Sequence, residues 1–137
     1  MDQKTSDGKK EYKTTDGKVR DSRSTTLVNV KVKYLRPRGY HSFMEWSRDP
    51  NHVYIGRNMS CYIPGARGSM WRNPFSAKKY GRRECIEMYE KELRSNEFLM
   101  SRLGKLKGKE LGCWCAPEPC HGDVLLKLIN ELNERGE

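Results

Sequence analysis

The segment from Leu111 to Leu132 leaves fewer folds open than any other part of the 137-residue chain. Residues 110–114 are typical of a short strand, and a loop with two prolines follows them. The apolar residues from Val124 to Leu132 recur at helical spacing and predict a helix that begins near Pro119 or Cys120. A strand, a loop and a helix in this order indicate an α/β unit, in which ligands bind beyond the carboxyl end of the strand.

The folded region is predicted to begin with a strand at Leu27. Val28, Val30, Val32 and Tyr34 alternate with polar residues, and a period of two predicts a strand with one solvent-exposed face. The spacing of apolar and turn-forming residues then predicts five further segments. They are a short helical or irregular piece at 42–48, a strand at 52–56, a loop at 57–76, a helix at 81–95 and a second helix at 98–106.

Together these segments predict an α/β domain with a small Rossmann-like sheet in two or three layers and flanking helices. Residues 27–137 suffice for one such domain. Residues 1–26 contain few sizeable apolar side chains, so we expect a disordered polar and basic tail. No apolar run approaches the ~20 residues of a membrane span, and the N-terminus has no secretory pattern. These features predict an intracellular, cytoplasmic protein that does not insert into membranes.

Five cysteines occur in the chain, at positions 61, 85, 113, 115 and 120. The number is odd and three of them cluster, whereas a secreted disulfide framework usually has an even and dispersed set. Clustered cysteines in a reducing compartment indicate a metal site, a reactive thiol or simple burial.

The clustered cysteines flank the predicted start of the last helix. Cys113 and Cys115 are two residues apart, so an extended backbone points both to one side, and Trp114 to the other, toward the core. Cys120 and His121 fall in the first helical turn, where the helix dipole lowers the pKa of a thiol. Asp123 lies near the same positive helix end.

Three interpretations of this segment compete. Cys113, Cys115, Cys120 and His121 could be the four ligands of a zinc ion, although their spacing is not that of a standard zinc finger. Alternatively, Cys120 could be a reactive thiolate with His121 or Cys115 as its base or partner. The third interpretation is that the cysteines are small buried apolar residues.

Two further motifs carry polar groups at strand ends or in loops. Gly56 permits close approach at the end of a strand, and Arg57 after it suits a phosphate or a carboxylate. Trp71, Asn73 and Phe75 lie among several Arg and Lys residues, an arrangement that could stack bases and hold phosphates. The competing interpretations are a surface ion pair for Arg57 and core packing for the two aromatic residues.

Charge is distributed unevenly along the chain, whose formal net charge is +9. Residues 27–83 contain twelve Lys and Arg but only two Asp and Glu, whereas residues 84–137 contain eight and eleven. A basic half of this kind suits polyanions such as nucleic acids or nucleotides. The alternative is a solvated basic surface without a partner.

Four motifs occur in the chain in a fixed order: VYIGR at 53–57, WxNPF at 71–75, LGCWCAP at 111–117 and CHGDVL at 120–125. In this order they resemble the domain-of-unknown-function family 4326, which is found in bacteria, phages and large DNA viruses. The resemblance covers residues 27–133. It implies that the family's marked positions are Gly56, Arg57, Trp71, Asn73, Pro74, Phe75, Cys113, Cys115, Cys120, His121 and Asp123.

Our leading hypothesis is a nucleotide- or nucleic-acid-directed α/β protein, with enzymatic activity left open. Arg57, Asn73 and the helix start at Cys120 would line one anion-accepting pocket, and Gly56, Trp71 and Phe75 would add to substrate binding. Cys120, His121 and Asp123 would be the catalytic groups. The alternative hypothesis is a non-catalytic zinc module that uses Cys113, Cys115, Cys120 and His121 and binds nucleic acid or a protein partner. The cofactor is otherwise open, and a viral chain would act inside the host cell.

Overall fold

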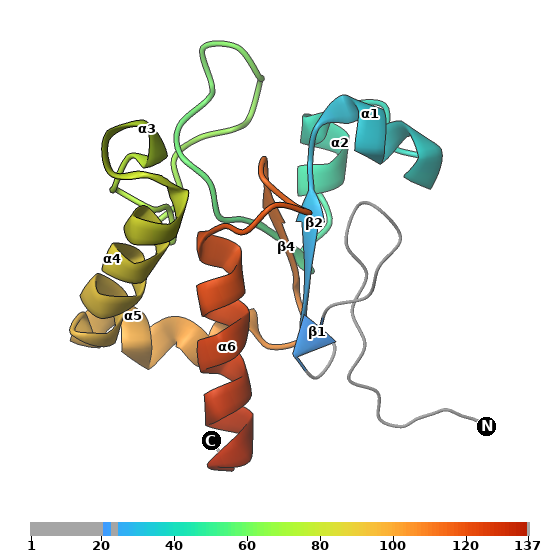
Figure 1. The fold of residues 1–137 in the computed structure, drawn as a ribbon. Helices are drawn as coiled ribbons and strands as arrows, with labels where there is room; N and C mark the ends of the chain where they lie inside the picture. The colour runs from blue at the N-terminus through green and yellow to red at the C-terminus, as the bar shows by residue number, and fades with distance from the viewer. Residues whose placement is uncertain (1–20, 23–24, 137) are drawn as a thin grey trace.

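The computed structural model describes residues 21–22 and 25–136. Its sheet has the order β1-β2-β4-β3, in which β2, β4 and β3 run parallel and β1 pairs antiparallel with β2 (Figure 1). The strands are β1 (Asp21–Ser22), β2 (Thr25–Asn29), β3 (His52–Tyr54) and β4 (Glu110–Cys113). The helices are α1 (Val32–Leu35), η1 (Arg36–Arg38), α2 (Phe43–Ser47), α3 (Ala77–Tyr80), α4 (Arg82–Arg94), α5 (Glu97–Arg102), η2 (Leu103–Leu106) and α6 (His121–Glu134). The fold is therefore α/β, as predicted.

The first predicted strand is only partly correct. Strand β2 ends at Asn29, and Val32–Leu35 forms the short helix α1 instead of continuing the strand. The side chain of Asn29 explains this end, because its amide donates hydrogen bonds to the carbonyls of Trp114 and Ala116 and its Oδ1 accepts one from the Lys31 N–H. Alternation of Val and Lys continues past Asn29, but the backbone has already turned.

Both faces of the sheet are covered, so the predicted solvent-exposed face of the first strand is wrong. On one face, Leu27, Leu111 and Ile55 join a buried cluster with residues of α4 and α6. On the other face, Val28 and Val30 pack against α1 and α2, where Trp46 is fully buried. The sheet thus lies between two helical layers, with α4, α5 and α6 on one side and α1 and α2 on the other (Figure 1).

The last helix begins where its sequence predicts. Cys120 is the N-cap residue of α6, its Sγ accepts the N–H of Gly122 at 3.3 Å, and its own N–H donates to Asp123 Oδ2 at 3.0 Å. This reciprocal capping satisfies amide groups that the first turn leaves without helical partners. The apolar stripe that ends at Leu132 then packs into the buried cluster that includes Leu27 and Leu111 of the sheet.

The predicted tail overlaps the fold at its end. Asp21–Ser22 forms β1, and β2 already begins at Thr25, so the sheet starts before the expected boundary at Leu27. The rest of the predicted tail, residues 1–20 and 23–24, lies outside the described residues. Within the described part of the chain, no helix has the length and apolar character that crossing a membrane requires.

Candidate functional site

A cavity of about 740 Å³ opens at the carboxyl ends of the parallel strands. Lys31 follows β2, Gly56 and Arg57 follow β3, and Cys113 ends β4. The loop before α3, the start of α4 and the start of α6 complete its walls. The cavity therefore occupies the place where α/β sheets usually bind ligands.

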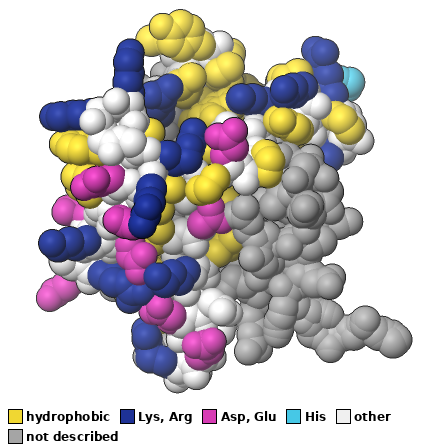
Figure 2. Space-filling view, in the orientation of Figure 1, with side chains coloured by type: hydrophobic (Ala, Val, Ile, Leu, Met, Phe, Trp, Pro, Cys, Tyr) yellow, Lys and Arg dark blue, Asp and Glu magenta, His cyan; other side chains and the backbone are white. Residues whose placement is uncertain are grey.

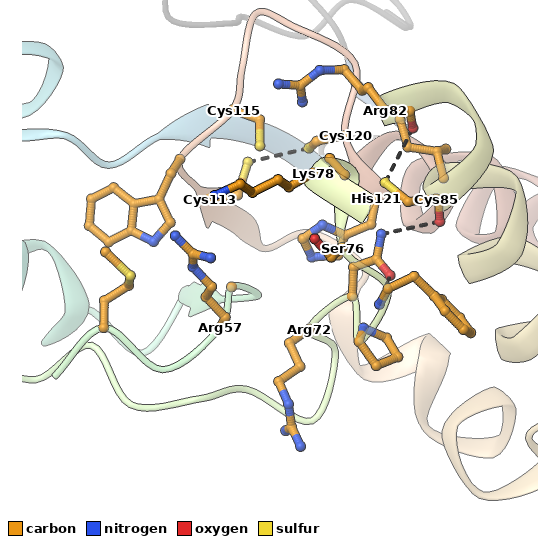
Figure 3. A pocket seen from close by; sticks show the side chains of 18 of the residues that line it. Arg57, Arg72, Ser76, Lys78, Arg82, Cys85, Cys113, Cys115, Cys120 and His121 are labelled. Atoms are coloured by element: carbon orange, nitrogen blue, oxygen red, sulfur yellow. Dashed lines mark hydrogen bonds between the residues drawn. The ribbon is translucent and has the colours of Figure 1, made fainter. Parts of the chain in front are cut away.

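Three thiols meet in one wall of this cavity, and we call Cys113, Cys115 and Cys120 the thiol cluster (Figure 3). The Sγ atoms of Cys113 and Cys120 are 3.4 Å apart, and the Cys115 thiol interacts with both. Cys113 and Cys120 have only 1% and 3% of their surface exposed, whereas Cys115 is partly exposed. All five cysteines of the chain are free thiols in the structure.

The thiol cluster holds its negative charge on Cys115. Hydrogen bonds from the Cys113 and Cys120 thiols, with a smaller contribution from Arg82, hold the pKa of Cys115 well below that of an ordinary thiol. The pKa of Cys113 is raised chiefly by its hydrogen bond with Cys115, whereas the pKa of Cys120 is raised first by its hydrogen bond with Cys113, then by that with Cys115 and by burial. Cys120, which the sequence predicts as the thiolate, is buried and its pKa is raised, whereas the partly exposed Cys115 has the lowered pKa that this role favours.

His121 lines the cavity, and one of its two ring nitrogens is occupied by a hydrogen bond within the protein. Its Nε2 lies 2.7 Å from the carbonyl oxygen of Ile55, and because a carbonyl can only accept, Nε2 carries the proton. The ring meets Tyr89 edge to face at 5.0 Å, and burial lowers its pKa. His121 is thus a neutral imidazole whose remaining acceptor is Nδ1.

The predicted zinc tetrad is not assembled. The Nε2 of His121 is bound to Ile55, not turned toward the thiols. Across residues 21–22 and 25–136, no group of three or more His, Cys, Asp or Glu side chains has an arrangement that could hold a metal ion. The proximity of the three thiols instead lowers the pKa of Cys115, through its hydrogen bonds with Cys113 and Cys120.

Asp123, predicted to be catalytic, is not among the residues that line the cavity. Its carboxylate accepts the backbone N–H of Cys120 and completes the capping of α6. Asp123 consequently positions Cys120 and the start of the helix instead of facing a ligand.

The two predicted partners from other strands and loops do reach the cavity. Arg57 and Asn73 both line it together with Cys120 and His121, as the sequence predicted. The amide of Asn73 also holds its own loop, because Oδ1 accepts the N–H of Phe75 at 2.9 Å and Nδ2 donates to the carbonyl of Cys85 at 3.3 Å. Asn73 is therefore engaged within the protein before any ligand arrives.

The predicted substrate-binding aromatic residues separate into two groups. Phe75 lines the cavity and contacts Tyr80 edge to face. Trp71 is buried in the core and is not among the lining residues, and its carbonyl accepts the hydroxyl of Tyr89. Trp71 thus closes the core under the loop, which was the competing interpretation of this motif.

The structure explains why residue 56 is a glycine, which the sequence alone does not reveal. A Cβ atom at this position would lie 2.5 Å from the hydroxyl of Tyr54. That hydroxyl donates to the carbonyl of Arg57 at 2.6 Å and accepts the indole N–H of Trp114 at 2.6 Å. Gly56 therefore makes room for Tyr54, which fixes the backbone at Arg57, in addition to lining the cavity.

Several lining residues were not predicted from the sequence. Lys31 reaches the cavity only because the chain turns after Asn29. Trp114 lines the cavity as well as packing beside Tyr54 and Phe43, so its assignment to the core alone is wrong. Strand β4 ends at Cys113, so the alternation of side chains along a strand does not predict where the Trp114 side chain lies. The signal that could have placed Trp114 in the site is an aromatic residue between two cysteines.

Five cationic side chains line the cavity: Lys31, Arg57, Arg72, Lys78 and Arg82. None of the lining residues in the described part of the chain is an Asp or a Glu. Arg82 donates to the Pro119 carbonyl, pairs with Glu118 at 3.3 Å and interacts with the Cys115 thiol. Lys31, Arg57 and Lys78 form no ion pair with any described residue. We call this site the basic cavity.

Comparisons with known proteins place the chain in a family. The model of a domain of unknown function, DUF4326, matches residues 40–131. A similar protein, an uncharacterised 12.4 kDa protein of enterobacteria phage T4 from the nrdA-td intergenic region, is 39% identical over 71 residues, which cover 48% of this chain and 65% of the phage protein. An uncharacterised protein of Acanthamoeba polyphaga mimivirus is 38% identical over 91 residues, which cover 60% of this chain and 69% of the viral protein.

The chain thus spans slightly less than two thirds of the phage relative's length. No solved structure matches the chain. The family model covers more than half of the chain, including every residue that lines the basic cavity except Lys31, and the start of α6. The chain therefore belongs to the DUF4326 family of domains of unknown function.

Proposed function

We propose that the basic cavity binds an anionic small molecule of nucleotide size, held by its phosphate groups. The observation that carries this proposal is the collection of five cationic side chains in one cavity whose described lining contains no carboxylate. Three of them, Lys31, Arg57 and Lys78, have no ion-pair partner in the described residues and so remain available to a ligand.

The size and lining of the cavity support a nucleotide over a bare phosphate ion. A volume of about 740 Å³ falls in the range of small-molecule sites, roughly 300–1,000 Å³. Trp114 and Phe75 add aromatic surface on which a base could stack. Arg57 offers a planar fork that can hold two phosphate oxygens at once.

The proposed site also contains a reactive group. Cys115 carries the charge of the thiol cluster and lies beside Arg82, so a bound anion would be close to a thiolate nucleophile. We therefore propose an enzymatic function at the same site, with Cys115 in the role that the sequence assigned to Cys120. The two relatives are viral proteins, which supports the interior of a host cell as the place of action.

The binding proposal is tested by titrating the full chain with ADP at low ionic strength and recording heat or tryptophan fluorescence. Arg57→Gln keeps a polar, hydrogen-bonding side chain but shortens it and removes its charge, and we expect the Kd to rise about 10- to 100-fold, the equivalent of one charge-assisted contact. The matched control is Arg83→Gln, because Arg83 is 92% exposed and lies outside the cavity.

Two results would contradict this proposal. One is equal weakening by Arg57→Gln and Arg83→Gln, which would mean that only net charge matters. The other is tight binding of a single-stranded oligonucleotide that ADP does not compete away, which would assign the basic surface to nucleic acid instead.

A further inference from the structure

The three thiols of the thiol cluster differ in solvent exposure, and anion binding by the basic cavity does not explain this difference. Cys115 is the partly exposed member, while Cys113 and Cys120 are buried directly behind it. All three line the basic cavity, and each lies within interaction distance of the other two. An electrophile in the cavity therefore meets Cys115 first, with two further thiols within reach of the sulfur it would modify.

We propose that Cys115 and Cys120 form a redox-active dithiol that reduces an anionic small-molecule disulfide bound in the basic cavity. The selectivity of this reaction rests on the proposed anion binding, whereas the exchange itself needs only the thiols. Cys115 is the attacking cysteine and Cys120 is the resolving cysteine.

The exchange proceeds in two balanced steps. The Cys115 thiolate attacks one sulfur of the small disulfide, whose S–S bond breaks, and the first small thiolate leaves with the bonding electron pair. Cys120 then attacks the Cys115 sulfur of the mixed disulfide and expels the second small thiolate, which takes the proton that Cys120 loses. Two protein thiols are oxidised to one disulfide, and the small disulfide is reduced to two thiols.

The position of Cys120 at the start of α6 favours it over Cys113 as the resolving thiol. Its Sγ already accepts the N–H of Gly122 at 3.3 Å, so negative charge that develops on this sulfur is stabilised by an amide and by the helix dipole. Cys113 is as buried as Cys120, but it ends strand β4 instead of capping a helix. Its contact with Cys120 at 3.4 Å then keeps the resolving thiol in place.

The charge of the cavity indicates the class of substrate. Five cations would attract a disulfide that carries carboxylates or phosphates, whereas a neutral hydroperoxide gains nothing from them. The volume of about 740 Å³ also exceeds what a peroxide would require. An anionic disulfide uses both features.

The test uses the reduced full chain with Cys61→Ser, because Cys61 is exposed outside the cluster and would react on its own. This protein is mixed with glutathione disulfide, and the products are identified by intact mass and peptide mapping. We expect loss of two hydrogens, release of two glutathione molecules per chain and a Cys115–Cys120 disulfide. A stable mixed disulfide as the only product, or a Cys113–Cys120 disulfide, would overturn the assignment.

Single substitutions in the same background separate the roles. Cys120→Ser retains a good helix N-cap, and we expect it to stop at the Cys115 mixed disulfide. Cys115→Ser should not react, and Cys113→Ser should complete the exchange with the same Cys115–Cys120 disulfide but more slowly, because it changes the donor that lowers the pKa of Cys115. Cys85→Ser is the control, because the Cys85 thiol lies outside the thiol cluster and donates to the carbonyl of Arg82 at 3.3 Å. Completion of the exchange by Cys115→Ser would contradict the proposal.

Two further arms distinguish this chemistry from binding and from metal capture. We expect glutathione disulfide to react at least ~10-fold faster than neutral hydroxyethyl disulfide at low ionic strength, a difference that salt should reduce. If both disulfides oxidise the pair at one rate, the thiol chemistry stands and the anion cavity fails. If added zinc binds and protects all three thiols from both disulfides, the dithiol proposal is overturned.

Discussion

The basic cavity and the helical face formed by α4 and α6 both contain Lys and Arg side chains, but carboxylates accompany these cations only on the helical face. On the helical face, Arg94 pairs with Glu90 and Glu131 at 2.8 Å, and Lys127 pairs with Glu90 at 3.0 Å. Figure 2 shows Asp and Glu among Lys and Arg over this part of the molecule. In the basic cavity, Lys31, Arg57 and Lys78 have no such partner among the described residues.

This difference indicates which charges are available for function. Cations on the helical face already spend their hydrogen bonds on carboxylates, and solvent screens them, so each pair adds little to stability. The cavity gathers five cations with no carboxylate among its described lining residues, so a bound anion would reduce their mutual repulsion. Charge alone therefore does not identify a binding surface, and the proposal of anion binding is based instead on cations without an ion-pair partner inside a cavity.

The largest effect that would break this comparison is expected from Arg57→Glu. Reversing a charge that lines the cavity removes one attraction and adds a repulsion, so we expect nucleotide affinity to fall by more than about 100-fold, at least ~3 kcal/mol. Binding isotherms with ADP measure the change. Circular dichroism should show an intact fold, because Arg57 forms no ion pair with a described residue. Unchanged affinity would remove Arg57 from the site.

The second prediction concerns pH. The pKa of Cys115 is lowered by its hydrogen bonds from Cys113 and Cys120, so its thiolate persists above that lowered pKa and is lost only in acid. Between pH 8 and pH 6, we expect the rate of Cys115 modification to fall less than about threefold, whereas an ordinary thiol with a pKa near 8.5 loses up to about 100-fold. The measurement is the rate of alkylation in Cys61→Ser protein, and an ordinary pH profile would contradict the shared charge.

A smaller effect is expected at Trp114. Its indole N–H donates to the Tyr54 hydroxyl, which in turn holds the backbone of Arg57. Trp114→Phe keeps an aromatic surface but removes this donor, so we expect a few-fold to ~10-fold weaker ADP binding, the cost of about one neutral hydrogen bond. Trp114→Phe combined with Arg57→Gln should weaken binding by less than the product of the two single effects. Full additivity would show that the contact does not act through Arg57.

The smallest effect is expected on the helical face. Glu131→Gln removes one carboxylate from Arg94, whose pKa is raised chiefly by that contact. Because both side chains are at least a third exposed, we expect a loss of about 0.5 kcal/mol or less in the free energy of unfolding, and no change in ADP affinity. Urea denaturation and titration measure the two quantities. Weaker ADP binding in Glu131→Gln would show that the helical face also contributes to ADP affinity, which would contradict the comparison.

Local patterns predicted the parts of the site that depend on neighbouring residues. The N-cap at Cys120 and the loop positions of Arg57 and Asn73 follow from helix, strand and turn signals along the chain, and parallel strands bring their ends together. Four motifs in order also identified the family.

The remaining features depend on contacts between distant segments. The end of β2 is set by Asn29 bonding to the loop after β4, which Val and Lys alternation cannot reveal. The charge on Cys115 depends on the approach of Cys113 and Cys120 from a strand and a helix. The contact of His121 Nε2 with the carbonyl of Ile55 likewise joins segments far apart in the chain, so the sequence position of His121 does not reveal it.

The most direct measurement compares two alkylating reagents on Cys115 in the Cys61→Ser protein: iodoacetate, which is an anion, and iodoacetamide, which is neutral. We expect the ratio of their rates to favour iodoacetate by about 10-fold relative to free cysteine, because cations in a cavity concentrate an anion beside the thiolate. Arg57→Gln and saturating ADP should each lower this ratio. A ratio equal to that of free cysteine, unchanged by either, would contradict a basic cavity that brings anions to Cys115.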